Sequence, residues 1–301
     1  MDRSLHQNRW DEIAWNGITF CKPASWEIAT MGRNYMMIGT HAYPRMEITW
    51  ASAQKPVTRQ RDIKKFQSRI RKQHLASVDS WTPFASWLQA LTSYETSGFS
   101  WKHPDRISYG LIVSCPSCQR VSLIQFFQNV DEPDIFHTVA PKVLSSFMDH
   151  ADGNDQQWAV FDVRATLPIF FRIKTYRFSP GFMEMVFSSR EQQISLYRWS
   201  PASVLLSGRN LPDFAESLSL CPDSATKKIL DSNRIEWENA PSFGLWTRLA
   251  AFLTGRFSHH RILIRHDPEN NRILAIKAES RQTMDPILFD RIFSSYEITA
   301  A

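Results

Sequence analysis

The sequence predicts an α+β protein made of two similar antiparallel-sheet and helix sandwich units in tandem. Three observations lead to this prediction. The chain has 301 residues, more than a single core usually serves, and 43% of them are hydrophobic, enough to build two cores. Short segments alternate apolar and polar residues, as half-buried antiparallel strands do, and segments of helical periodicity lie between them. The two halves also carry similar patterns in the same order.

Each half opens with a strand that ends in a proline, followed three residues later by an aromatic residue. These segments run from Ile18 to Ile28 and from Val163 to Ile173. Each half then has a glycine and, 18 residues later, a tryptophan: Gly32 and Trp50, then Gly181 and Trp199. The shared order and spacing predict that the two halves fold alike.

Each half is then predicted to continue with a helix, a hairpin and a closing helix. The first helices are expected over 58–75 and 200–206, and the closing helices begin at Pro141 and Pro286, where a first-turn proline is favourable. The predicted hairpins join 108–114 to 120–127 and 261–265 to 272–277. A polar stretch with turn-forming residues, 149–155, is the predicted linker, which gives domains 1–150 and 156–301.

A strand ending in Pro-x-x-Trp, a meander and a closing helix together resemble the Mog1/PsbP/DcrB-like α/β sandwich. The residues that carry the resemblance run from Ile18 to Trp26 and from Val163 to Phe171. The resemblance implies a tandem duplication of this sandwich. It also implies a role in binding or assembling other proteins, because members of the group mostly act in that way.

The Cys115-Pro116-Ser117-Cys118 motif lies at the turn of the first predicted hairpin. Two thiolates separated by two residues can bind one metal ion, zinc above all, although a structural zinc ion needs four ligands. Cysteines or histidines distant in the sequence would have to complete such a set: Cys21, Cys221, His103 or His137. A turn with two small buried thiols and a redox site are the alternatives, but a redox Cys-x-x-Cys normally opens a helix, and a strand is expected here.

The predicted helix over 58–75 carries seven cations opposed by Asp62 alone: Arg59, Arg61, Lys64, Lys65, Arg69, Arg71 and Lys72. All of them except Arg59 fan across the face opposite Ile63, Phe66 and Ile70. This basic face is predicted to contact an acidic protein surface or, as the alternative, the phosphates of a nucleic acid. A solvated helix surface gives the same pattern.

The remaining features favour a non-catalytic protein. No Gly-rich phosphate loop, dinucleotide fingerprint or His-Glu-x-x-His motif occurs, so no cofactor other than zinc is expected. The N-terminal residues lack an apolar signal region and no apolar run is long enough to span a membrane, so a cytoplasmic location without a membrane partner is expected. The predicted function is that of an adaptor or accessory subunit that binds a protein complex through the basic helix and sheet edges. A nucleic-acid-binding factor and a thiol oxidoreductase are the alternatives.

Overall fold

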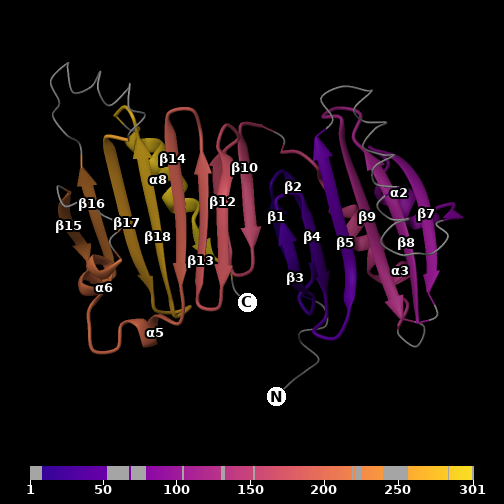
Figure 1. The fold of residues 1–301 in the computed structure, drawn as a ribbon, viewed down its shortest axis with the longest axis horizontal. Helices are drawn as coiled ribbons and strands as arrows, with labels where there is room; N and C mark the ends of the chain where they lie inside the picture. The colour runs from indigo at the N-terminus through magenta and orange to yellow at the C-terminus, as the bar shows by residue number, and fades with distance from the viewer. Residues whose placement is uncertain are drawn as a thin grey trace. The chain divides into compact units, whose positions relative to one another are not determined.

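The computed structural model describes residues 9–52, 68, 79–103, 105–129, 133–151, 153–218, 220, 225–239, 257–283 and 285–299. The chain divides into two compact units. The first consists of Met1–Asp152 with Ala159–Phe161, and the second of Gly153–Trp158 with Asp162–Ala301. Each unit contains a seven-stranded antiparallel sheet (Figure 1).

The first unit begins with the hairpin of β1 (Trp10–Trp15) and β2 (Ile18–Pro23). Its seven-stranded sheet has the order β3-β4-β5-β9-β8-β7-β6. The strands are β3 (Glu27–Gly32), β4 (Tyr35–Gly39), β5 (Pro44–Ser52), β6 (Asp79–Ser80), β7 (Glu95–His103), β8 (Arg106–Ser114) and β9 (Arg120–Asn129). The described helices are α2 (Ala85–Ala90), α3 (Ile135–Thr138) and α4 (Ala140–Ser145).

Aromatic side chains fill the core of the first unit on both faces of its sheet. Trp87 of α2 is fully buried, its indole nitrogen donates to the carbonyl of Phe136 at 2.8 Å, and its ring lies 5.3 Å from that of Phe126 on β9. The next residue, Phe127, points to the opposite face because side chains alternate along a strand, and there it packs with Trp101. The alternation seen in the sequence therefore sets which aromatic residue joins which side of the core.

The second unit has the strands β10 (Asp155–Val160, which includes residues of both units), β11 (Val163–Pro168) and β19 (Glu297–Ile298). Its seven-stranded sheet has the order β12-β13-β14-β18-β17-β16-β15. The strands are β12 (Arg172–Ser179), β13 (Phe182–Ser188), β14 (Gln192–Trp199), β15 (Thr226–Asp231), β16 (Arg234–Asn239), β17 (His259–Asp267) and β18 (Arg272–Ser280). The described helices are α5 (Ala202–Leu205), α6 (Leu211–Ser217) and α8 (Pro286–Ser295).

The closing helix of the second unit, α8, begins at Pro286 as predicted. Asp285 caps it by accepting a hydrogen bond from the backbone N–H of Ile287 at 3.0 Å. Phe289 and Ile292, which lie three residues apart on one face of the helix, are fully buried. The guanidinium of Arg261 on β17 lies 4.3 Å from the centre of the Phe289 ring, so an arginine covers the edge of this core.

The predicted α+β class is wrong, because the protein is mostly β. The described residues form nineteen strands and six helices, and the longest of these helices has ten residues. The helix predicted over 200–206 is the shorter, four-residue α5, because the backbone of Pro201 is extended (φ −78°, ψ 140°) and the helix starts only after it. Apart from residue 68, which is helical, the helix predicted over 58–75 lies outside the described residues. Within the described part of the chain, no helix is long and apolar enough to cross a membrane.

The two seven-stranded sheets share one strand order, since β3 to β9 of the first are arranged like β12 to β18 of the second. The register corrects one detail of the predicted repeat. Trp50 lies opposite Ser122, the third residue of β9, whereas the third residue of β18, Leu274, lies opposite Arg198. Trp50 therefore corresponds to Arg198 and not to Trp199, so the shared spacing of 18 residues does not mark equivalent tryptophans.

Candidate metal centre and binding surfaces

The Cys-Pro-Ser-Cys motif forms the turn between β8 and β9, where the sequence predicts a hairpin. The backbone N–H of Cys115 donates to the carbonyl of Arg120 at 3.0 Å, which closes the turn, and Gln119 adopts φ +58°. The backbone N–H of Cys118 lies 3.5 Å from the sulfur of Cys115, which acts as a weak acceptor. The two cysteine side chains are therefore held close together by the turn.

Two residues that follow α4, Asp149 and His150, meet this turn. The thiol of Cys118 donates to Oδ2 of Asp149 at 3.2 Å, and the sulfur of Cys115 lies 3.8 Å from Nδ1 of His150. The same nitrogen lies 2.7 Å from Oδ1 of Asp149. One donor atom from each of these four residues lies within 4.8 Å of the other three. Cys115 and Asp149 are buried, whereas Cys118 and His150 reach the surface.

Hydrogen bonds from β2 and β9 fix the segment that carries Asp149. Thr19 and Met148 exchange two backbone hydrogen bonds of 2.8 Å, and the hydroxyl of Ser146 accepts from the backbone N–H of Cys21 at 2.8 Å. The guanidinium of Arg120 donates to the backbone carbonyls of Gly17 and Asp149. Because Arg120 also closes the cysteine turn, one residue ties together both segments of the cluster.

The electrostatics of the cluster disfavour a bare thiolate. Partial desolvation and the negative charge of Asp149 raise the pKa of Cys118 to about 12. Burial and the same carboxylate raise the pKa of the nearby Tyr94. A nucleophilic cysteine needs the opposite shift, so these surroundings do not favour thiol oxidoreductase chemistry.

The structure brings Cys115 and Cys118 together but completes the set with residues that the sequence analysis missed. Cys21 lies on β2 outside the four-residue group, and His137 contacts Asp134 at the start of α3. Cys221 and the side chain of His103 are outside the described residues. Asp149 and His150 lie in the stretch that the sequence predicts to be a linker. A usable signal was their position as an acid–histidine pair directly after a helix predicted to pack on the sheet.

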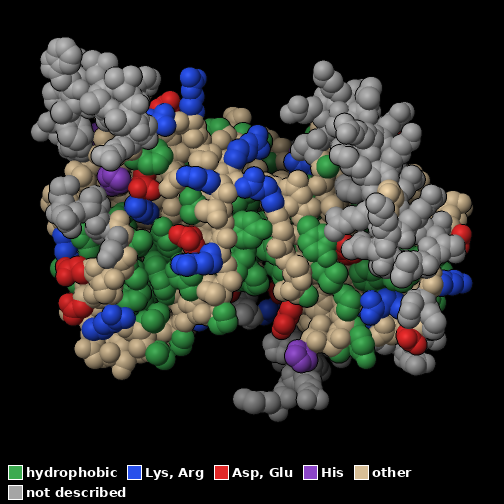
Figure 2. All heavy atoms as spheres, viewed as in Figure 1, with side chains coloured by type: hydrophobic (Ala, Val, Ile, Leu, Met, Phe, Trp, Pro, Cys, Tyr) green, Lys and Arg blue, Asp and Glu red, His purple; other side chains and the backbone are tan. Residues whose placement is uncertain are grey.

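The predicted basic face cannot be placed in the fold. All seven of its residues, Arg59, Arg61, Lys64, Lys65, Arg69, Arg71 and Lys72, lie outside the described residues, so their role stays a prediction. On the face shown in Figure 2, the described Lys and Arg side chains are interspersed with Asp, Glu and apolar side chains.

The edges of the two seven-stranded sheets are the other predicted binding surfaces. One of the four, β6, has two residues, and the other three each contain one irregular register, near Ile28 in β3, Ile173 in β12 and Ile229 in β15. The edge strands β3 and β12 also have partly buried residues, whereas β15 has none. All six residues of β15 are exposed, and the side chain of Ile229 is 61% exposed. Within the described residues, no strand pairs with its outer edge (Figure 1).

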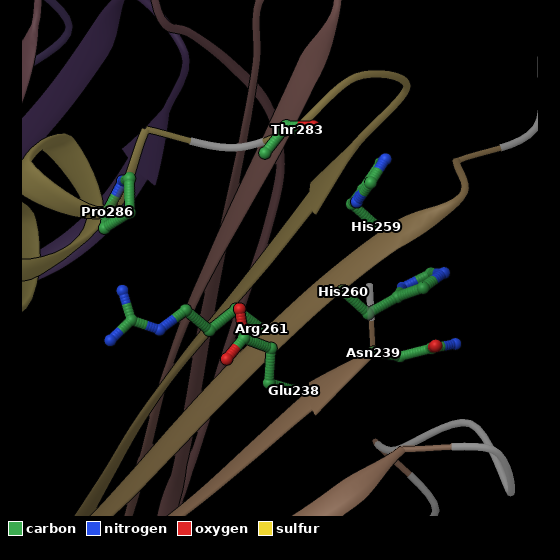
Figure 3. Close-up of a pocket in the computed structure, with 7 residues that line it drawn as sticks. All are labelled: Glu238, Asn239, His259, His260, Arg261, Thr283 and Pro286. Atoms are coloured by element: carbon green, nitrogen blue, oxygen red, sulfur yellow. The ribbon is translucent and has the colours of Figure 1, made fainter. Parts of the chain in front are cut away.

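A small pocket of about 170 Å³ lies in the second unit, between the ends of β16 and β17 and the start of α8 (Figure 3). Two of the residues that line it, Arg261 and His260, are engaged in ion pairs. Arg261 contacts Glu236 and lies 3.0 Å from Asp290, and His260 lies 3.4 Å from Glu279. In Figure 3 the rings of His259 and His260 extend away from the guanidinium of Arg261. These groups form a structural charge network and do not converge on the pocket.

The sequence matches no protein-family model, and it matches no curated protein. Two solved structures of the immunity protein TplEi of the T6SS from Pseudomonas aeruginosa are matched by this chain, one in the apo form and one complexed with a peptide designated "L". Both have 10% sequence identity and a TM-score of 0.33. The matches cover 99% and 97% of this chain and 100% and 99% of theirs. The comparisons show no similarity to the Mog1/PsbP/DcrB-like group expected from the sequence.

Proposed function

We propose that this chain is a non-catalytic protein that binds another protein by adding an extended, acidic segment of its partner to β15. The observation that carries the proposal is that all six residues of this edge strand are exposed, with 61% of the surface of Ile229 accessible to solvent. An edge strand offers a row of backbone donors and acceptors, and an added strand pairs with them. The exposed isoleucine supplies apolar area that such a strand would bury.

The charges of β15 favour an acidic segment. Lys227 and Lys228 are both exposed, and Lys227 lies 2.6 Å from Glu216 of α6. Lysines on an edge strand discourage self-association, because two copies of the edge would bring like charges together. They favour a partner of opposite charge and would speed its encounter. The basic residues from Arg59 to Lys72 would serve the same partner by attracting it, which is the role that the sequence predicts for them.

A photo-crosslinking amino acid placed at Leu230, in cells that naturally produce the protein, tests this proposal. The expected result is a covalent adduct with one protein, through an acidic segment identified by mass spectrometry. The matched control is the same amino acid at Val204, an exposed apolar position of α5 in the same unit. Adducts with the same proteins at both positions, or with no protein at position 230, would contradict the proposal.

A charge-reversal variant, Lys228→Glu, separates a protein partner from a nucleic acid. With an acidic protein segment, the yield of the adduct at position 230 is expected to fall several-fold. The remaining yield is expected to be unaffected by nuclease treatment. An adduct that nuclease removes, and whose formation falls steeply with salt, would favour the nucleic-acid-binding alternative, because phosphate contacts release counterions.

A further inference from the structure

We propose that Cys115, Cys118, Asp149 and His150 bind one zinc ion, which fastens the β8–β9 turn to the segment after α4. This inference is independent of the proposed binding at β15, because the four residues belong to the first unit and β15 belongs to the second. It rests on the donor atoms of the four residues, which lie within 4.8 Å of one another and come from segments more than 30 residues apart.

The donor set matches the chemistry of zinc. Two sulfurs, one imidazole nitrogen and one carboxylate oxygen are all ligands that Zn²⁺ accepts, and the sulfurs disfavour magnesium and calcium. With bonds of about 2.0–2.3 Å, the ligand atoms of a tetrahedral zinc ion lie about 3.3–3.8 Å apart. The separations of 3.2 Å between Cys118 and Asp149 and 3.8 Å between Cys115 and His150 are close to this range, and the donor atoms as a set, which spread over up to 4.8 Å, would draw together by about 1 Å around the ion. Four protein ligands fill the tetrahedron, which is typical of a structural site.

The buried carboxylate of Asp149 supports a cation at this place. Its side chain is 2% exposed, and its two oxygens contact the thiol of Cys118 and the ring of His150. Burial of a carboxylate is unfavourable unless positive charge or strong hydrogen bonds compensate it. On binding, Zn²⁺ would replace the two thiol protons, which are released to solvent, so the net charge of the site would stay at −1 and the carboxylate would be stabilised by its direct bond to the ion.

The second unit shows that the turn itself does not require a metal. Asp267 stands five residues before Arg272, as Cys115 stands five residues before Arg120, so Asp267 and Asn270 take the places of Cys115 and Cys118. There the backbone N–H and the side-chain amide of Asn270 donate to the carboxylate of Asp267 at 3.1 and 3.0 Å. The cysteines are therefore not needed to make this hairpin, and a different function must account for the pair.

The residues that correspond to Asp149 and His150 can also be located in the second unit. The hydroxyl of Ser295 accepts from the backbone of β11 at 3.0 Å, as the hydroxyl of Ser146 accepts from the backbone of β2 at 2.8 Å. Three and four residues after these serines stand Asp149 and His150 in the first unit, and Ile298 and Thr299 in the second. The second unit therefore has none of the four proposed ligands and serves as an internal control.

Metal content of the purified full-length chain tests the proposal directly. The protein is prepared with a phosphine reductant, incubated with zinc sulfate at neutral pH, desalted and analysed by mass spectrometry for metals. About one zinc per chain is expected for the wild type. The variants Cys118→Ser and His150→Ala are expected to retain less than a tenth of it, since each removes one of four ligands. Cys21→Ser, which removes a cysteine outside the cluster, is expected to retain all of it.

Cobalt substitution of the wild-type chain provides a readout that does not depend on the variants folding. The metal is removed with a chelator, and cobalt chloride is then added to the reduced chain. A thiolate-to-cobalt charge-transfer band with the intensity of two sulfur ligands is expected, together with the visible absorption of a tetrahedral ion. One equivalent of zinc should abolish both. Absence of the band, or zinc retained by both Cys118→Ser and His150→Ala, would overturn the proposal.

Discussion

The β8–β9 and β17–β18 turns have the same backbone plan but different side chains. In both, a proline follows the first turn residue, and the residue before the next strand has a positive φ, +58° at Gln119 and +54° at Asn271. The first side chain of each turn accepts from the backbone N–H three residues later, at 3.5 Å to the sulfur of Cys115 and at 3.1 Å to the carboxylate of Asp267. Both turns therefore place an acceptor at this position, so the need for an acceptor does not explain why the first turn has a sulfur there.

The arginine that begins the strand after each turn extends the comparison. Arg120 donates to the backbone carbonyl of Gly17, in the β1–β2 turn. Arg272 donates at 2.8 Å to the carboxylate of Asp162, in the equivalent β10–β11 turn, and Arg198 donates to the same carboxylate at 2.7 Å. The first unit thus holds its turn with backbone acceptors, and the second holds it with an aspartate between two arginines.

Removal of the aspartate should have the largest effect on stability. Asp162→Ala leaves the two largely buried guanidinium groups of Arg198 and Arg272 without their carboxylate, which is expected to cost about 3–5 kcal/mol. Urea unfolding with separate probes for the two units measures this loss. Asp155→Ala is the matched control, because its ion pair with Arg291 is exposed and should contribute less than about 0.5 kcal/mol. Equal losses in the two variants would show that the burial of Asp162 is unimportant.

Substitution of the corresponding glycine should have a smaller effect. Gly17 has φ +88°, and a Cβ atom there would lie 2.7 Å from the guanidinium of Arg120. Gly17→Ala is expected to cost about 2–3 kcal/mol, from backbone strain of about 1–2 kcal/mol and the displaced arginine. Gly208→Ala is the control, because Gly208 has φ +74° and open space around it, so only the strain should appear. Gly17→Ala should also weaken zinc binding, since Arg120 holds the backbone of Asp149.

The seventh residue after Arg120 is Phe127, and the seventh residue after Arg272 is Glu279. We expect the contribution of Glu279 to the free energy of unfolding to depend on pH, and that of Phe127 not to. Burial by itself would raise the pKa of Glu279, but His260 and Lys277 lower the pKa to about 2. A carboxyl group whose pKa is lower in the folded state stabilises the protein above its unfolded value of 4.5. Glu279→Gln should therefore cost about 1–2 kcal/mol near neutral pH, as expected for hydrogen bonds to a charged group.

This cost should shrink as the pH falls from about 4.5 toward about 2, where Glu279 of the wild type takes up a proton. Unfolding free energies of the wild type and Glu279→Gln, measured across this range, test the prediction. Phe127→Leu, an apolar change at the corresponding position of the first unit, should have a cost that does not change with pH. A constant difference between Glu279→Gln and the wild type would contradict the assigned ion pairs.

The sequence predicted the parts of this comparison that depend on local patterns. The alternation around Cys115 to Cys118 located the β8–β9 hairpin, and Pro286 located the start of α8. The sequence did not predict that Asp149 and His150 belong to the metal site. Their contact with the cysteines depends on how α4 packs on the sheet, and spacing along the chain does not reveal this packing. The predicted class was wrong because each seven-stranded sheet includes strands that the sequence did not predict, such as β7 and β15, and because the described helices have at most ten residues.

Transfer of the cysteines to the second unit should have the smallest effect on stability. In Asp267→Cys/Asn270→Cys, sulfur takes the acceptor position that it already holds in the first unit, so the cost should be about 0.5–1 kcal/mol for the weaker hydrogen bonds. The chain should still bind one zinc ion, because Ile298 and Thr299 supply no ligand beside the new pair. Adding Ile298→Asp and Thr299→His should raise the content to two. A second zinc ion bound by the cysteine pair alone would show that Asp149 and His150 are dispensable, and that the turn sequence by itself makes the site.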